Sequence, residues 1–251
     1  MALIPEVVTY RITSKCNNRC GYCYGPSRDL SEMNFASILK MFDLLRNLGV
    51  NAIVLTGGEP LDRDDIEEIV LELSKFQFRI FLDTNNDTNF QNILRILDFY
   101  KGKTKRPILR IGTVVTKQNI DQLISIGNLI RDYPVDIWKI YEYIPQNNAY
   151  SNRGEFDVSS TLFDKTVNEI IARFRTKCKI IISRRINRSR AYFFIQSEGN
   201  VFMPVDDGNV CREVTIGNIF DHDIFEKWRK FVLEGNYIEN VEKTFDYHFQ
   251  P

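Results

Sequence analysis

Three cysteines stand close together near the start of the 251-residue chain, at Cys16, Cys20 and Cys23. Cysteine thiolates bind metals, so three of them on one short stretch are expected to share one metal centre. A structural zinc site needs four protein ligands, and no second closely spaced pair of ligands stands nearby. The remaining candidate ligands are scattered along the chain at Cys178, Cys211, His222 and His248.

The number of cysteines in this stretch indicates an open metal position. An iron–sulfur cube is normally held by a cysteine thiolate at each iron, so a loop that supplies three thiolates leaves one iron free for a small ligand. A free position on the metal indicates chemistry, whereas a structural site would be closed. The spacing therefore favours a reactive cluster over a zinc knuckle.

A second candidate element begins 34 residues after the last of these cysteines, where Gly57-Gly58-Glu59-Pro60 follows the apolar run 52–56. Glycines let the backbone approach a ligand closely, and the carboxylate of Glu59 could receive a cationic amino group. By itself this tetrapeptide would predict only a turn. Its place after the cysteines suggests that the two elements act together.

The C-x3-C-x2-C spacing, with Tyr22 before its last cysteine, resembles the cluster loop of radical S-adenosylmethionine (SAM) enzymes, and residues 57–60 resemble their GGEP segment. The resemblance implies that Cys16, Cys20 and Cys23 hold a [4Fe–4S] cluster whose open iron binds the amino and carboxylate groups of SAM. One electron from the cluster would cleave SAM to methionine and a 5′-deoxyadenosyl radical, which abstracts hydrogen from a substrate. A one-electron reductant such as flavodoxin or ferredoxin would be a partner.

The same resemblance names candidate contacts to SAM, with the GGEP segment holding the methionine moiety. Tyr22 could touch the adenine or simply pack, and Asn119 could approach SAM or cap the helix that follows it. Thr84 and Asn85 end a strand at the edge where ligands of α/β proteins gather. The expected SAM contacts are Tyr22, Gly57, Gly58, Glu59, Pro60, Thr84, Asn85 and Asn119.

Basic residues later in the chain are candidates for substrate binding. Arg110 and Lys139 lie on predicted strands, where either could point into the fold toward an anionic group or outward to solvent. The stretch 173–190 carries eight lysines and arginines and no acidic residue. A run of charges is usually a solvated face, yet this one could bind phosphates.

Strand and helix patterns alternate over the first two thirds of the chain, which is typical of βαβ units in a parallel sheet. The pattern and the resemblance predict an α/β fold, a partial (β/α)6 TIM-like barrel. Only three convincing strands precede Thr113, where the family carries strand five, so one βα unit is expected to be shortened or hidden within 93–98. The expected strands are 7–12, 52–56, 79–83, 108–115 and 137–143, and the expected helices are 34–48, 62–73, 89–100 and 120–130.

Two parts of the chain are expected. Residues 1–145 would form the core barrel, and residues 146–251 a small α+β C-terminal extension that packs on the barrel, covers its open end and has mostly antiparallel strands. Residues 190–195 and 201–203 predict a β-hairpin with a Gly-Asn turn. Because only Cys211 lies near that hairpin, no auxiliary cluster is expected.

Charge and hydropathy exclude some classes of partner. Lysine plus arginine equals aspartate plus glutamate at 33 each, so net charge gives no reason to expect a nucleic acid polymer or a membrane as partner. No apolar run is long enough for a spanning helix, and the first residues show no secretory signal. The protein is therefore predicted to be cytoplasmic, where clustered cysteines act as metal ligands.

Three functions remain open at this point. Segments 138–141 and 192–195, with the basic stretch, resemble viperin-like nucleotide dehydratases, which act on nucleoside triphosphates. Segments 115–119 and 216–219 resemble peptide- or cofactor-modifying maturases of the same superfamily. The substrate would accordingly be a small molecule or a peptide. A non-catalytic iron–sulfur or zinc module is the third possibility.

Overall fold

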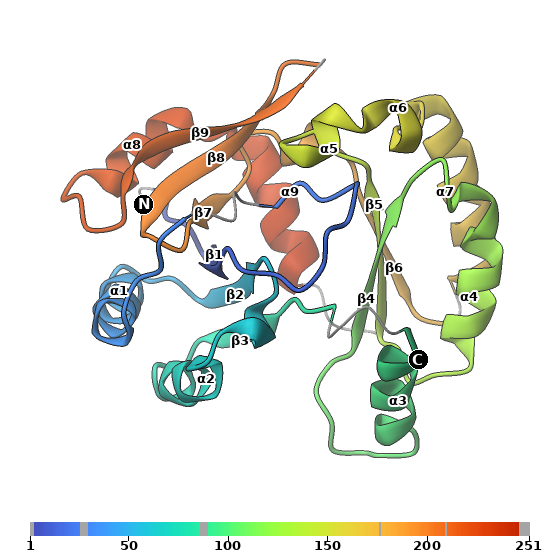
Figure 1. Ribbon diagram of the computed structural model, residues 1–251, viewed down its shortest axis with the longest axis horizontal. Helices are drawn as coiled ribbons and strands as arrows, with labels where there is room; N and C mark the ends of the chain where they lie inside the picture. Colours follow the sequence, from blue (N-terminus) through green and yellow to red (C-terminus); the bar gives the residue numbers. More distant parts are fainter. Residues whose placement is uncertain (1–2, 26–29, 86–89, 176, 209, 246–251) are drawn as a thin grey trace.

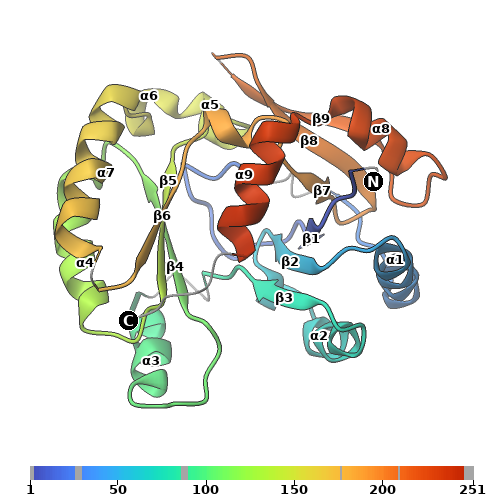
Figure 2. The same ribbon diagram turned by 180° about the vertical axis from the view of Figure 1, so that it is seen from behind.

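The computed structural model describes residues 3–25, 30–85, 90–175, 177–208 and 210–245. Within these residues the chain forms two β-sheets that face each other, with helices on their outer sides and helix α9 (Glu234–Phe245) between them (Figures 1 and 2). The start of a predicted helix at Asn89 and the candidate ligand His248 lie outside the described residues.

The first sheet has six strands in the order β3-β2-β1-β7-β8-β9. Their bounds are β1 (Val7–Thr13), β2 (Ala52–Gly57), β3 (Arg79–Leu82), β7 (Phe193–Ile195), β8 (Asn200–Asp206) and β9 (Cys211–Asn218). The first four strands in this order are parallel, and β8 and β9 extend the sheet as an antiparallel meander. Because β1 lies in the middle, both of its faces are covered, which explains its mostly apolar sequence.

The second sheet has three parallel strands in the order β4-β5-β6. Their bounds are β4 (Arg110–Val115), β5 (Ile137–Glu142) and β6 (Lys179–Ser183). With β1, β2 and β3 they supply the six strands of the predicted partial barrel, which the fold confirms. Backbone hydrogen bonds join β4 to β5 and β5 to β6. No such ladder joins β3 to β4 within the described residues.

Two details of the prediction were wrong. Residues 93–98 belong to helix α3 (Phe90–Tyr100), so no strand is hidden there, and Thr113 lies on the fourth strand of the chain. The sixth parallel strand is β6, which follows residue 145 and had been expected among antiparallel strands. The isoleucine-rich sequence of β6 predicts a strand and does not predict its direction. Whether it runs parallel or antiparallel to its neighbour depends on the strand with which it pairs. A domain boundary at residue 145 stays a prediction.

Helices cover the outer faces of both sheets. Their bounds are α1 (Phe35–Asn47), α2 (Ile66–Lys75), α4 (Leu123–Arg131), α5 (Asn148–Ser151), α6 (Arg153–Phe156), α7 (Ser160–Phe174) and α8 (Ile224–Phe231), with short 3-10 helices η1 (Pro60–Asp62), η2 (Ile120–Gln122) and η3 (Ile186–Arg188). Asn34 caps α1 by accepting the N–H of Ser37 at 2.9 Å. One apolar core joins α1, α2 and α8 to the first sheet, and a second joins α4 and α7 to the second sheet.

Helix α9, which was not predicted from the sequence, connects the two sheets. Its Tyr237 hydroxyl accepts the N–H of Glu6 at 2.6 Å and donates to the carbonyl of Ile4 at 2.9 Å, just before β1. Its Asn240 amide donates at 2.7 Å to the carbonyl of Asn187, in the segment that follows β6. The helix therefore bonds to both halves of the barrel.

None of the helices in the described ranges combines the length and the apolar character needed to cross a bilayer. A cytoplasmic location stays a prediction.

Candidate active site

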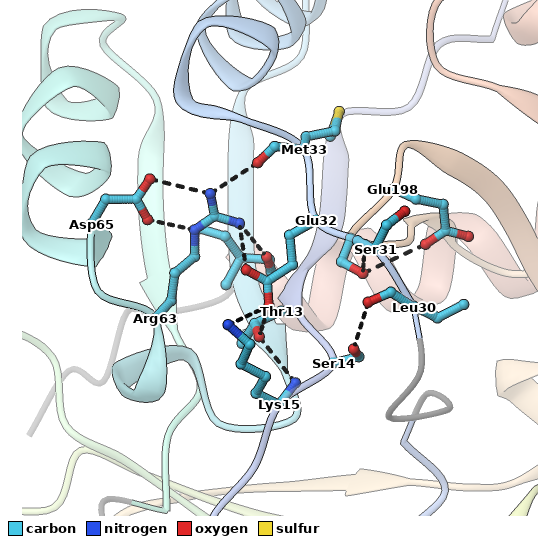
Figure 3. Close-up of polar contacts among 12 residues, drawn as sticks. Thr13, Ser14, Lys15, Leu30, Ser31, Glu32, Met33, Arg63, Asp65 and Glu198 are labelled. Carbon is cyan, nitrogen blue, oxygen red and sulfur yellow. Dashed lines mark hydrogen bonds and ion pairs between the residues drawn. The ribbon is translucent and has the colours of Figure 1, made fainter.

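The three cysteines lie on a segment that leaves the carboxyl end of β1, here called the cysteine loop and comprising residues 16–25. Contacts between the chain before and after this loop hold its base closed (Figure 3). The Thr13 hydroxyl donates to Glu32 at 2.6 Å, and the Ser14 hydroxyl donates to the carbonyl of Leu30 at 3.1 Å. Both contacts fix the points where the loop begins and where the chain returns.

Arg63 reinforces this base from the segment that follows β2. Its guanidinium donates to the carbonyls of Ile12 at 2.8 Å and Met33 at 2.9 Å, and it pairs with Asp65 at 2.6 Å (Figure 3). The hydrogen bond from Arg63 lowers the pKa of Asp65. One buried guanidinium therefore ties together the end of β1, the return of the chain and the start of α2.

Gly57 and Gly58 pack directly on the base of the cysteine loop. Gly58 N–H donates to the carbonyl of Thr13 at 2.9 Å, and Glu59 N–H donates to the carbonyl of Lys15 at 2.8 Å. A Cβ atom at Gly58 would lie 1.9 Å from the Lys15 oxygen, and one at Gly57, where φ is +151°, would lie 2.3 Å from the Thr13 oxygen. The two glycines are thus required by the contact between these segments, an account that the sequence did not suggest.

Glu59 joins the GGEP segment to the end of β3. Its carboxylate is buried and accepts hydrogen bonds from the Leu61 N–H at 3.0 Å, the Thr84 hydroxyl at 2.6 Å and the Asn85 N–H at 3.0 Å. Pro60 is buried at the start of η1. Glu59 therefore brings Thr84 and Asn85 to the site, and its carboxylate is already supplied with donors from this chain.

The cysteine sulfurs receive backbone hydrogen bonds. The Sγ of Cys16 accepts the Asn18 N–H at 3.4 Å, and the Sγ of Cys23 accepts the Gly25 N–H at 3.3 Å. Hydrogen bonds of this kind stabilise thiolates and tune the sulfur ligands of iron–sulfur clusters. In the part of the chain that the structure describes, no three His, Cys, Asp or Glu side chains converge on a single metal ion. Three thiols on one short loop, two of them accepting backbone N–H groups, are the donor chemistry that an iron–sulfur cluster uses.

A cavity of about 350 Å³ lies between the two sheets, and both the cysteine loop and α9 line it. Cys20 and Cys23 line it from the cysteine loop, and Asn240 lines it from α9. The carboxyl ends of parallel strands are where α/β barrels place their chemistry. Among the residues predicted for SAM or substrate, those that line this cavity are Tyr22, Gly57, Asn85, Arg110 and Lys139.

Two cations in the cavity have no anionic partner among the described residues. Lys139 Nζ lies 4.9 Å from the centre of the Tyr141 ring, and Arg188 Cζ lies 5.4 Å from the centre of the same ring. Arg188 is only 7% exposed, and its Nε makes no hydrogen bond. Burial lowers the pKa of Lys139 because it disfavours the charged form. An anionic ligand beside Tyr141 would supply the missing countercharge.

Two other cations in the cavity are neutralised by this chain. Arg110 forms an ion pair with Asp83, and this pair spans the gap between β4 and the end of β3. Arg11, on β1, pairs with Glu213 of β9 at 2.5 Å. Arg110 therefore lines the cavity, and its charge is shared with a carboxylate.

The cations of the basic stretch 173–190 face different parts of the molecule. Arg185, for example, pairs with Asp206 at 2.6 Å. Of the described members of this stretch, only Arg188 lines the cavity. Asn119 also lies away from the cavity, because its amide donates to the carbonyl of Val114 at 2.9 Å and accepts the N–H of Thr116 at 2.8 Å.

Sequence reasoning did not single out three residues that shape this cavity, Arg11, Arg188 and Glu213. Arg11 carried a detectable signal, since it is the one charged residue in a central strand of the predicted sheet. Arg188 could not be distinguished from seven neighbouring cations. Glu213 contacts the cavity residues Arg11 and Gln146 only because β9 pairs with β8.

The fold and the site define an enzyme built on a partial parallel barrel with a metal-cluster loop at the carboxyl ends of its strands. Residues 10–125 match the family model described as the Radical SAM superfamily. A protein named probable GTP 3′,8-cyclase from Methanothermobacter thermautotrophicus is 27% identical over 236 residues, which cover 81% of this chain and 77% of that protein. A protein of the same name from Archaeoglobus fulgidus is 40% identical over 76 residues, 30% of this chain and 25% of its own length.

Solved structures agree on the fold. The structure of native anSMEcpe with bound AdoMet and Cp18Cys peptide has a TM-score of 0.60 and 16% identity, and the match covers 93% of this chain and 84% of that one. Streptococcus suis SuiB bound to precursor peptide SuiA has a TM-score of 0.56 and 15% identity over 78% of this chain, which spans 58% of SuiB. The chain is a radical SAM enzyme, and its cofactors are a [4Fe–4S] cluster and SAM.

Proposed function

We propose that this radical SAM enzyme acts on a small anionic molecule, a nucleoside triphosphate, held in the cavity between the two sheets. The observation that carries the proposal is the pair of unpartnered cations, Lys139 and Arg188, in the same cavity as Cys20 and Cys23. Buried cations without a countercharge are costly, so a site that keeps two of them is suited to an anion.

Each part of the site has a proposed task. Cys16, Cys20 and Cys23 would hold the cluster as thiolates, and the cavity walls at Gly57 and Asn85 would face SAM. When bound, these cofactors supply a 5′-deoxyadenosyl radical for hydrogen abstraction. The protein positions the substrate and excludes water, and no side chain is required as a general base. Lys139 and Arg188 would neutralise phosphate oxygens, and Tyr141 would fix the distance between the two cations.

The relatives support a nucleotide as the first substrate to test. The two described above are named as GTP 3′,8-cyclases, so guanosine triphosphate is the first member of a nucleotide panel. A dehydratase of the viperin-like kind would use the same class of substrate. A peptide stays the alternative substrate, and a non-catalytic metal-binding module is contradicted by membership in an enzyme class.

Anaerobic turnover would test this proposal. The reconstituted protein would be mixed with SAM, dithionite and one nucleotide or peptide at a time, and 5′-deoxyadenosine and altered substrate would be measured by mass spectrometry. We expect one nucleoside triphosphate to accelerate SAM cleavage at least tenfold, and the matching nucleoside without phosphates to have no such effect. Acceleration by a peptide and by no nucleotide would overturn the proposal.

A matched variant would link that result to the cavity. Replacing Arg188 with methionine removes the buried charge while keeping an unbranched side chain, so we expect nucleotide-dependent cleavage to fall about tenfold or more. The basic-stretch variant Arg185→Met, which changes an arginine paired with Asp206, is the control. It should lose stability without a selective loss of nucleotide response.

A further inference from the structure

Four side-chain amides from the segment that follows β5 hold the backbone of the cysteine loop. They belong to Gln146, Asn147, Asn148 and Asn152, here called the amide clasp. Each donates to a carbonyl group in residues 20–25 of the loop, and the N–H of Ala149 adds a bond to the carbonyl of Cys23 at 3.2 Å. From the sequence, this segment was expected only to be part of the C-terminal extension.

The bonds are made to the carbonyls of Cys20 and Cys23 and to those of the residues that follow each of them. Asn148 donates to the carbonyl of Cys20 itself at 3.3 Å, and Asn152 donates to the next carbonyl at 3.0 Å. Asn147 donates to the carbonyls of Tyr24 at 3.1 Å and of the following glycine at 2.9 Å. The clasp therefore fixes the peptide groups that carry two of the three cysteines.

Two observations distinguish the clasp from an ordinary polar loop. Asn147 has φ +51° and ψ −125°, a backbone conformation that glycine normally takes, and its side chain is bonded to the loop. Gln146 is buried, and its amide orientation is set from behind: its Nε2 donates to Glu213 at 2.7 Å, and its Oε1 accepts from the Cys211 thiol at 3.1 Å.

The contacts behind Gln146 lead into the cavity. Burial raises the pKa of Cys211 to about 11, so this thiol keeps its proton and remains a donor. Glu213, which accepts from Gln146, also pairs with Arg11 in the cavity wall. The clasp residue Gln146 is therefore bonded to Glu213, the carboxylate that also neutralises Arg11.

We propose that the amide clasp is a positioning device that sets the orientation of Cys20 and Cys23 and thereby the environment and retention of the cluster. The proposal rests on the assignment of these cysteines as cluster ligands. Amide groups around an iron–sulfur loop influence a cluster through the hydrogen bonds and solvent exposure of its sulfurs. The clasp residues act through the loop backbone, so they are positioning residues.

The test uses two substitutions in the full chain. Asn147→Gly removes the amide and keeps a residue that adopts positive φ without strain, and Asn152→Asp replaces the donor by a carboxylate oxygen that repels the Gly21 carbonyl. The matched control is Asn168→Asp, which makes the same chemical change on the exposed face of α7. All three positions are partly or fully exposed, so the variants should fold.

Four measurements compare the wild type, the Asn168→Asp control and the Asn147→Gly/Asn152→Asp double variant. With the reconstituted protein, we expect the double variant to lose its iron to a chelator about tenfold faster. Its reduced cluster should show an altered electron paramagnetic resonance spectrum with and without SAM. In the cluster-free protein, amide exchange in residues 16–25 should accelerate. Overall thermal unfolding of the cluster-free proteins should stay within about 3 °C, which separates a local effect from general destabilisation.

The outcomes separate the two proposals. Iron loss within twofold of wild type together with a superimposable spectrum would overturn the clasp as a positioning device. A wild-type protein that loads its cluster and ignores every nucleotide would refute the nucleotide proposal and leave the clasp result valid. Faster amide exchange in residues 16–25 without any change at the cluster would also count against the clasp, because it would show a loop contact with no influence on the metal site.

Discussion

Lys139 and Arg188 are single residues that should favour anion binding and lower the stability of the free protein. Both cations are held in the cavity without a carboxylate partner in the described residues, and aromatic rings compensate them only in part. Removing an ion from water without a countercharge costs several kcal/mol in the free protein, in order-of-magnitude terms. A bound anion supplies the missing countercharge and offsets this cost. The two cations therefore favour ligand binding and lower the free energy of unfolding of the ligand-free protein.

The first prediction concerns Lys139→Met, which keeps the length of the side chain and removes its charge. The cluster-free variant should unfold about 2–4 °C higher than wild type, because a buried unpaired charge has gone. Its affinity for the nucleotide should fall about 10–100-fold, because a charge-assisted contact has been lost. Thermal unfolding and equilibrium binding check the two effects. A variant that is both less stable and unchanged in affinity would show that Lys139 has no role with the anion.

The second prediction follows from the lowered pKa of Lys139. Burial favours the neutral amine, so the free protein gives up this proton at a lower pH than an exposed lysine would. Anion binding needs the charged form, so affinity should decline as the pH rises through this lowered pKa, and the bound anion should raise the pKa again. Binding measured between pH 7 and 10 should show this decline in wild type. The decline should be absent in Lys139→Met, and an equally steep decline there would assign it to another group.

The third prediction concerns Gly58, where a side chain would meet backbone atoms that cannot turn away. Gly58→Ala should destabilise the cluster-free protein by about 3 kcal/mol and lower cluster loading, because the base of the cysteine loop must move. Urea unfolding and iron content measure the two effects. Gly235→Ala is the control, since a Cβ there meets no atom within 4 Å. Gly58→Ala with normal stability and iron content would show that the two segments can separate without loss.

At the scale of elements, the ends of the parallel strands form the site because each loop is bonded to its neighbours. The cysteine loop contacts the GGEP segment, the end of β3 through Asn18 and Asn85 at 3.3 Å, and the amide clasp after β5. Arg63 connects the end of β1 and the chain that returns at Met33 to the start of α2. Loosening one of these contacts should therefore affect the cysteines even where no cysteine is touched.

The fourth prediction concerns the pair of Arg63 with Asp65. The hydrogen bond from Arg63 lowers the pKa of Asp65 below its ordinary value of 3.8, so the unfolded chain takes up this proton first as the pH falls. The contribution of the pair is complete above about pH 4 and is lost at lower pH. Asp65→Asn should lower the free energy of unfolding by about 1 kcal/mol at pH 7 and by less at pH 3. Urea titrations at both values test this, with the exposed Asp132→Asn as a control that should change neither.

Elements with a local signal could be predicted from the sequence, and elements set by distant contacts could not. The apolar face and Asn34 cap of α1, and the apolar strand β1, are local patterns, and both elements lie where they were expected. The direction of β6 depends on its pairing with β5, and α9 buries few side chains, among them Tyr237 and Asn240, so its pattern is weak. The motifs revealed the cysteines, whereas the residues of the amide clasp were expected only to belong to the C-terminal extension.

At the scale of the whole molecule, the barrel consists of two sheets that no backbone ladder joins within the described residues. The Arg110–Asp83 pair bridges β3 and β4, and α9 bridges the opposite side of the space between the sheets (Figure 2). Both bridges also line the cavity, through Arg110, Asp83 and Asn240. The groups that hold the halves together are therefore among those that a substrate would contact.

The last prediction tests this coupling at Tyr237. Burial raises its pKa to about 12, so the hydroxyl keeps its proton, donates to the Ile4 carbonyl and accepts the Glu6 N–H. Tyr237→Phe keeps the ring in its place and removes both bonds, which should cost about 1–2 kcal/mol and lower the melting temperature by about 5 °C.

Because α9 bonds to both halves of the barrel, amide exchange should accelerate in residues 4–12 and also in residues 179–190, which are distant in sequence. Tyr150→Phe, at an exposed tyrosine on α5, is the matched control and should change neither region. Faster exchange confined to residues 4–12 would mean that α9 stabilises the first sheet alone. Faster exchange in both regions, reversed by a nucleotide that fills the cavity, is the result expected if one helix and one ligand hold the same two sheets together.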